Sequence, residues 1–160
     1  MRTLLLFLLL TSAAASAGEF PTDAIRVSWT ISQIDQASLT IRKSSKGTRI
    51  DFRDHTWCLY VPRQLSLTAE EAVQLGKVFA RTKEFAQRFA GTRDQQVTIP
   101  VFDKTSVRFQ TDGFGAFHVL VVDPQGIDSL KLTKEQAEHF GPHLDRMVEM
   151  VKFLDSKVSL

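Results

Sequence analysis

The sequence predicts an α+β protein built from two tandem repeats, each an antiparallel strand meander with one packed helix, in the order ββββα followed by βββ(β)α. Three observations support this fold class: a twelve-residue motif occurs twice, apolar and polar residues alternate before each copy, and helical periodicity follows each copy. The composition, 43% hydrophobic and 24% charged, is that of an ordinary globular domain. It excludes collagen-like, disordered and disulfide-rich chains.

The first seventeen residues have the three parts of an export signal. Arg2 supplies a positive charge, the seven residues Leu4–Leu10 are all apolar, and residues 15–17 (A-S-A) have the small-residue form that signal peptidase cleaves. The apolar run is much shorter than the ~20 residues needed to span a bilayer. We therefore expect residues 1–17 to be removed, leaving 18–160 as a single mature domain that is secreted or periplasmic, with no transmembrane segment.

Alternation with a period of two predicts strands that bury one face. Ahead of the first copy of the motif, the expected strands are Ile25–Ile31, Leu39–Lys43, Arg49–Arg53 and Trp57–Val61. Ahead of the second copy they are Val97–Val101, Val107–Gln110 and Phe117–Val122, with a short fourth strand at Leu130–Leu132. Turn residues separate the strands closely enough for hairpins. The two repeats therefore cover about residues 25–90 and 97–155.

The repeated motif reads L-x-L-T-x-E-x-A-x-x-[LF]-G and occupies residues 65–76 and 130–141, with six of twelve positions identical. In each copy the threonine is followed three residues later by Glu or Gln, the pattern of a capping box at the start of a helix. We expect one helix from Thr68 to about Phe89 and a second from Thr133 onward. Pro142 should kink the second helix after His139, because proline lacks a backbone donor.

This layout resembles, in its architecture, the ββββα repeats of the purine-rich-element-binding (PUR) family. The resemblance covers most of residues 18–160 and rests on the order of elements rather than on a shared motif. It therefore implies a fold and transfers no residue role. Nucleic acid, which that family binds, is an unlikely partner for a chain with an export signal and a net charge of only +2.

Two surface features favour a binding module. Arg42, Lys43, Lys46 and Arg49 lie within eight residues that contain no acid, at the tip of an expected hairpin. They would attract an acidic ligand, although a solvated turn is the simpler interpretation. The segment D-G-F-G places Phe114 on a loop tip. An exposed aromatic ring there would anchor a partner, unless it folds back onto the core.

A metal site is the alternative interpretation. Glu135, His139 and His143 follow one another at intervals of four residues, so a straight helix would align them as ligands for zinc or nickel. Pro142 lies between the histidines, and the H-E-x-x-H pattern is missing. The single cysteine, Cys58, cannot form an intramolecular disulfide and is expected to be buried or, alternatively, to pair between chains.

No motif in the sequence predicts catalysis. A nucleophile elbow and a glycine-rich phosphate loop are both missing, and Cys58 has no recognisable base nearby. We therefore assign no catalytic residue and no cofactor. The chain is interpreted as an exported, soluble, non-catalytic binding or interaction module for an unknown protein or acidic ligand, with a homodimer possible. The alternative is an exported enzyme or metal-dependent protein that uses the His139/His143 region.

Overall fold

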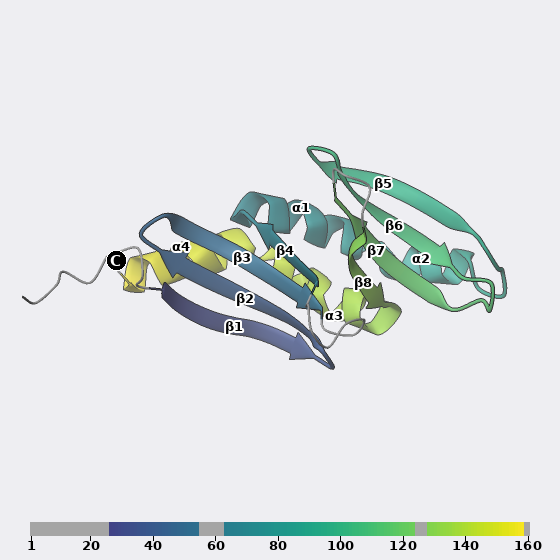
Figure 1. Ribbon diagram of the computed structural model, residues 1–160, viewed down its shortest axis with the longest axis horizontal. Helices are drawn as coiled ribbons and strands as arrows, with labels where there is room; N and C mark the ends of the chain where they lie inside the picture. The colour runs from purple at the N-terminus through teal and green to yellow at the C-terminus, as the bar shows by residue number, and fades with distance from the viewer. Residues whose placement is uncertain (1–25, 55–62, 124–127, 159–160) are drawn as a thin grey trace, which may run out of the picture.

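Two four-stranded antiparallel sheets, each followed by helices, make up the protein. The structure, a computed structural model, describes residues 26–54, 63–123 and 128–158. The first sheet has the order β1 (Arg26–Ile34), β2 (Ala37–Ser44), β3 (Gly47–Asp54), β4 (Arg63–Leu67). The second has the order β5 (Gln96–Phe102), β6 (Thr105–Thr111), β7 (Phe117–Val122), β8 (Asp128–Thr133). Every strand pairs with its neighbour in the sequence, so both sheets are plain meanders (Figure 1).

The helices come in two pairs, one after each sheet. α1 (Ala69–Phe79) and α2 (Thr82–Arg88) follow the first sheet, and α3 (Lys134–Asp145) and α4 (Met147–Lys157) follow the second. The predicted fold class, two tandem strand-plus-helix repeats, is confirmed. The fourth strand of the first repeat lies at Arg63–Leu67, directly before the helix, and the strand predicted at Trp57–Val61 falls outside the described residues.

Both capping boxes predicted from the repeated motif are present. The Thr68 hydroxyl oxygen accepts a hydrogen bond from the Glu71 amide at 3.2 Å, and the Thr68 amide donates to the Glu71 carboxylate at 2.7 Å. Thr133 and Gln136 make the same two bonds at 3.2 and 2.9 Å. Each repeat therefore begins its helix in the same way, immediately after its fourth strand.

The predicted continuous helix from Thr68 to Phe89 is wrong, and Pro142 does not interrupt the second helix, where a kink after His139 stays a prediction. The first helix stops at Phe79 and resumes at Thr82, while the second runs through Pro142 to Asp145 before it breaks. The breaks fall at Arg81 (φ −87°, ψ 0°) and Arg146 (φ −97°, ψ 6°). These arginines are 65 residues apart, the same offset as Thr68 and Thr133. The break therefore belongs to the repeat rather than to the proline.

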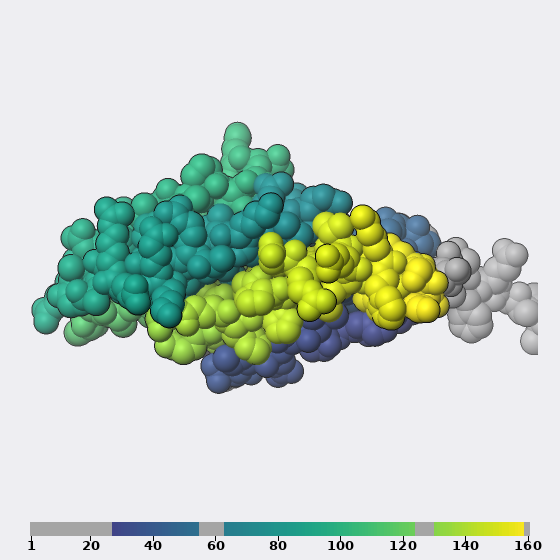
Figure 2. Space-filling view, turned by 180° about the vertical axis from the view of Figure 1, so that it is seen from behind, coloured from purple at the N-terminus to yellow at the C-terminus, as the bar shows by residue number. Residues whose placement is uncertain are grey.

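Each break redirects the chain onto the sheet of the other repeat. α2 packs on the second sheet, where the Phe85 ring stacks on Phe109 with centroids 4.7 Å apart. α4 packs on the first sheet, where Lys43 Nζ donates to the Asp155 carboxylate at 2.7 Å. Figure 2 shows the two helix pairs crossing on the same side of the molecule. The repeats are thus intertwined, and each sheet receives its outermost helix from the other repeat.

α1 and α3 cross at the centre and join the two cores. The ring of Phe52, on β3, lies 4.7 Å from that of Phe140 on α3 and 6.3 Å from that of Phe79 on α1. All three side chains are fully buried, and burial of a side chain of this size contributes roughly 1.5–3 kcal/mol. Because a helix of the second repeat contacts a strand of the first so closely, the two repeats share one core.

The four helices cover only one side of the sheets. They lie behind both sheets in Figure 1 and in front of them in Figure 2. Along the described parts of the chain, no helix is long and apolar enough to cross a membrane. The opposite sheet faces carry no helix within the described ranges, so their side chains are the natural place to look for a binding surface.

Candidate functional site

The helix-free face of the first sheet carries a cluster of arginines. Buried apolar residues alternate along β2 and β3, among them Leu39 and Ile50, so the residues between them point to the opposite face. Strand pairing then sets Arg42 opposite Arg49, Thr40 opposite Asp51, and Ser38 opposite Arg53. We call Arg42, Arg49, Arg53 and Asp51 the arginine face. It combines three positive charges with one negative charge.

Asp51 lies at the centre of the arginine face and orients two of its arginines. Its side chain is only 2% exposed, and its carboxylate oxygens lie 3.3 and 3.2 Å from Nη2 of Arg42. The same carboxylate lies 3.8 Å from Nη2 of Arg53. One carboxylate thus serves two guanidinium groups, each of which keeps further N–H donors for another acceptor.

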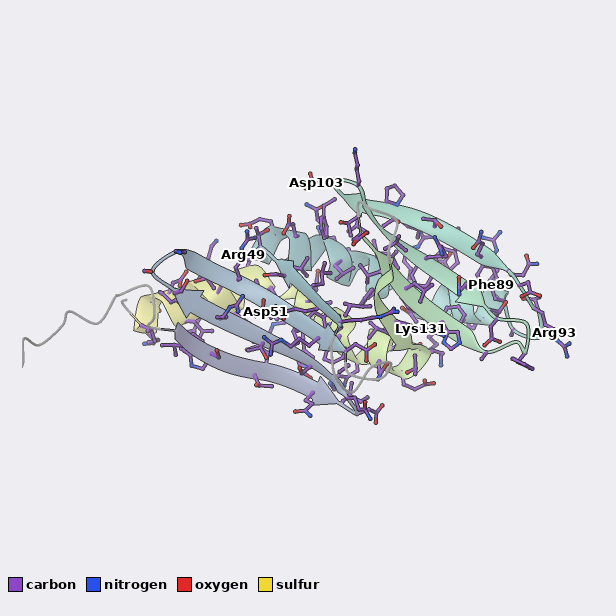
Figure 3. All side chains as sticks on the ribbon, viewed as in Figure 1. Arg49, Asp51, Phe89, Arg93, Asp103 and Lys131 are labelled. Atoms are coloured by element: carbon purple, nitrogen blue, oxygen red, sulfur yellow. The ribbon has the colours of Figure 1, made fainter. Side chains whose placement is uncertain are left out.

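Arg49 completes the arginine face without an ion pair of its own among the described residues. It is exposed and follows the β2–β3 turn, two residues before Asp51 on the same strand (Figure 3). Like charges directly opposite on neighbouring strands, as at Arg42 and Arg49, are unfavourable by roughly 0.2–1 kcal/mol. An anion bound between them would remove this repulsion.

The structure separates the four basic residues of the predicted hairpin site. Arg42 and Arg49 lie together on the arginine face, and Lys46 is exposed in the turn, where it makes an interaction within the protein. Lys43 lies on the other side of the sheet, where its ammonium group donates to Asp155 at 2.7 Å and to the Val158 carbonyl at 2.6 Å. Lys43 therefore holds α4 in place instead of facing a ligand.

Arg53 was missing from the sequence-based site, although a usable signal was present. Its position on β3 follows Arg49 and Asp51 at intervals of two, so the same alternation that paired Arg42 with Arg49 also places Arg53 on that face. The run of basic residues around the turn ends at Arg49, before Arg53. A run of charged residues contains only residues that are close in the sequence. On a sheet, the residues that lie together are those that share a face, even when they belong to different strands.

Phe114 stands clear of the core, with 95% of its surface exposed. The loop beneath it is held by Asp112, whose Oδ1 accepts hydrogen bonds from the amides of Phe114 and Ala116, both at 2.9 Å. The bond from Ala116, then those from His118 and Phe114, lower the pKa of the Asp112 carboxyl against the opposing effect of burial. The ring is thus presented on an ordered loop, and its role as a partner anchor stays a prediction.

The two histidines of the alternative metal site lie close together. The rings of His139 and His143 have centroids 5.4 Å apart, and the Nε2 of His139 lies 2.6 Å from the Ser32 hydroxyl on β1. Burial, together with the nearby His139 and Arg146, lowers the pKa of His143. In the portion of the chain that is described, Glu135 does not join them, since no three His, Cys, Asp or Glu side chains form a group that could hold a metal ion. Cys58 lies outside that portion.

A hollow of about 550 Å³ lies over the crossing of α1 and α3. Gly76, Gly141 and Pro142 form part of its floor, and charged side chains of both signs, such as Lys77 and Asp145, stand around it. Neither its shape nor its mixed charge selects a particular ligand.

Comparison with known proteins found no match: no family model fits the chain, and neither a curated protein nor a solved structure resembles it closely enough to be counted as similar.

Proposed function

We propose that the protein is an exported, soluble, non-catalytic binding module that takes an acidic ligand on the arginine face. The observation that carries this proposal is the sharing of one buried carboxylate, Asp51, between two arginines on a sheet face that none of the described helices covers. Arginine presents a planar fork of donors that suits carboxylate, sulfate and phosphate groups. Asp51 orients the guanidinium groups of Arg42 and Arg53, and the arginine face keeps a net positive charge.

The open shape of this face favours an extended ligand over a small enclosed one. Small-molecule sites are concave and bury most of their ligand. The arginine face lies instead on a sheet, with the hydroxyl-bearing Ser38 and Thr40 opposite its members on β2. Such a surface supports an acidic polymer, for example a sulfated or carboxylated glycan, whose successive charges meet successive donors.

Binding should be weak and sensitive to salt. A chain whose net charge is only +2 creates little long-range attraction, so affinity comes from short-range contacts. Added salt screens exposed charges over about 8 Å at physiological ionic strength. We expect retention on heparin at low salt and release near physiological salt.

The test compares two variants with the same change in charge. The double variant Lys46→Glu, Arg49→Glu alters Arg49 of the arginine face and the exposed Lys46 in the adjoining turn. Arg93→Glu, Lys104→Glu alters two exposed residues of the second repeat, and Figure 3 shows Arg93 at the far end of the molecule. The first variant should pass through a heparin column at low salt, and the second should be retained like the wild type. Equal loss in both variants, or no retention of the wild type, would contradict the proposal.

A further inference from the structure

An apolar groove runs along the outer edge of the first sheet. It lies between the edge strand β1 and α4 and has a volume of about 540 Å³. Its apolar lining consists of Trp29, Ile31, Met150, Phe153 and Leu154. Phe153 is 62% exposed. Among the described residues, it is one of two large apolar side chains that are classed as exposed.

The second repeat has buried phenylalanines at two of the equivalent positions. Positions 65 residues before Met150 and Leu154 are Phe85 and Phe89, and both are buried against the second sheet. There Phe85 stacks on Phe109, while the Phe89 ring lies 6.4 Å from that of Phe117. The hollow beside α2, of about 350 Å³, is lined by Phe89 and Phe117 rather than by the edge strand β5. The groove beside α4 differs because it borders the edge strand of the first sheet.

The strand beside the groove, β1, is an edge strand that pairs on one side only among the described residues. Exposed edges are normally blocked by charges or proline, because their free backbone groups can pair with another strand. β5, the corresponding edge of the second sheet, contains Pro100 and a shift in pairing just after it. β1 has a similar shift near Thr30, yet the eight residues Val27–Ile34 include neither a charge nor a proline.

We propose that β1 pairs with β1 of a second copy of this chain, in antiparallel orientation about a two-fold axis. The exposed edge requires an extended strand as its occupant, and the absence of charge along it requires a strand that is also uncharged. β1 itself has both properties. Antiparallel pairing about a two-fold axis is self-complementary and is the commonest way in which identical chains associate.

The charges at the rim of the groove fit this arrangement. α4 runs antiparallel to β1, since Asp155 near its end contacts Lys43, the pairing partner of Val27 near the start of β1. Glu149 near the start of α4 and Lys157 at its end share the groove side of the helix with Phe153. Arg146 also lines the groove and lies 3.8 Å from Glu149, an exposed ion pair that contributes little and leaves Glu149 accessible to a second cation. A two-fold axis across β1 brings Glu149 of each copy towards Lys157 of the other copy, and the exposed Phe153 rings become buried.

The experiment measures molar mass by light scattering during gel filtration at micromolar concentration. The wild type should have twice the chain mass, and Phe153→Glu should have the mass of one chain with an unchanged circular dichroism spectrum. Phe114→Glu is the matched control, because it changes the other highly exposed phenylalanine and should remain dimeric.

Two further variants test the orientation. Glu149→Lys should weaken the dimer, and adding Lys157→Glu to it should restore the dimer, because the exchanged charges attract again across the two-fold axis. A monomeric wild type, or equal dissociation by Phe153→Glu and Phe114→Glu, would overturn the proposal. The dimer does not depend on the arginine face, so Lys46→Glu, Arg49→Glu should remain dimeric even where it fails to bind heparin.

Discussion

Gly76 of α1 and Gly141 of α3 meet where the two helices cross, so closely that a Cβ atom added at Gly76 would lie 3.0 Å from the Gly141 carbonyl oxygen. The same Cβ would lie 2.7 Å from the amide nitrogen of Asp145. These glycines are the last residues of the two copies of the repeated motif. Both helices continue beyond them, so the conserved spacing reflects a close helix crossing and not the end of a helix.

The two glycines should respond differently to alanine. Gly76→Ala forces backbone apart, and such overpacking costs roughly 1–3 kcal/mol, which outweighs the gain of about 1 kcal/mol in helix propensity. Gly141→Ala places its Cβ 3.5 Å from that of Phe79, an ordinary contact, and should be neutral or slightly stabilising. Urea unfolding of the two variants checks this. Equal destabilisation would show that the crossing is looser than described.

Removal of the Phe85 side chain should destabilise the repeat to which it does not belong. Phe85 lies on α2 of the first repeat and stacks on Phe109 of the second sheet. Phe85→Ala should lower the free energy of unfolding by about 3–5 kcal/mol and increase amide exchange in β6. Phe114→Ala serves as the control and should stay within about 0.5 kcal/mol of the wild type. If amide hydrogen exchange became faster in the first sheet alone, this result would contradict the packing of α2 on the second sheet.

Acid should weaken the attachment of α4. The hydrogen bond from Lys43, and then that from Thr48, lowers the pKa of Asp155 below its ordinary value of 3.8. The folded state therefore prefers the carboxylate. Its contribution to stability is fully present above pH 3.8 and is lost as the pH falls through the pKa of the folded state.

This contribution should be below about 1 kcal/mol, because the Asp155 side chain is partly exposed and the pair is screened. We expect the wild type to lose more stability than Asp155→Asn between about pH 5 and pH 3, as measured by urea unfolding at each pH. Parallel pH profiles for the two proteins would show that Lys43 does not act through this ion pair.

Asp112 should hold the Phe114 loop in one conformation. Its carboxylate accepts two backbone hydrogen bonds, so Asp112→Ala should speed amide hydrogen exchange at Phe114 and Ala116. Phe114→Ser keeps both bonds and should leave exchange at Ala116 unchanged. If the serine variant loosens the loop as much as the alanine variant does, the ring itself contributes to the order of the loop.

The N-terminal sequence predicts export with cleavage after Ala17. Expression with a functional secretion pathway should yield a protein that begins at Gly18, as read by intact-mass analysis of the exported fraction. Ala15→Arg with Ala17→Arg removes the small residues that the peptidase reads and should leave the leader attached. A soluble cytoplasmic product that retains residues 1–17 in the wild type would contradict the prediction.

Local patterns were sufficient to predict most of the strands, the starts of α1 and α3, and the buried faces of the strands. Alternation identified Leu39, Ile41 and Phe52 as inward-facing, and all three are fully buried. The capping boxes at Thr68 and Thr133 placed the starts of the helices correctly, because a cap is formed by residues within three positions of one another. Interactions between residues this close in the sequence can be predicted from a short segment of it.

The exchange of helices could not be predicted in the same way. An apolar stripe shows that a helix buries one face, but it does not show which sheet receives that face. Neither glycine nor proline occurs at the breaks, which fall at Arg81 and Arg146, so the sequence contains no turn residue that would predict them. The candidate site was predicted incompletely for the same reason. The partner of Lys43 is Asp155, 112 residues later in the sequence, and the two residues come together only when the chain folds.

The covering of β1–β4 by α4 also sets an order of events during biosynthesis. The first sheet is made early, yet α4, the helix that packs on it, ends at Lys157 and leaves the ribosome long afterwards. Contacts over such separations form slowly, since a long loop must close first. The amino-terminal half should therefore remain incompletely folded until most of the chain has been translated. A chain that completes its fold this late is still largely unfolded while it is being translated. An unfolded chain is the form that a secretion channel accepts.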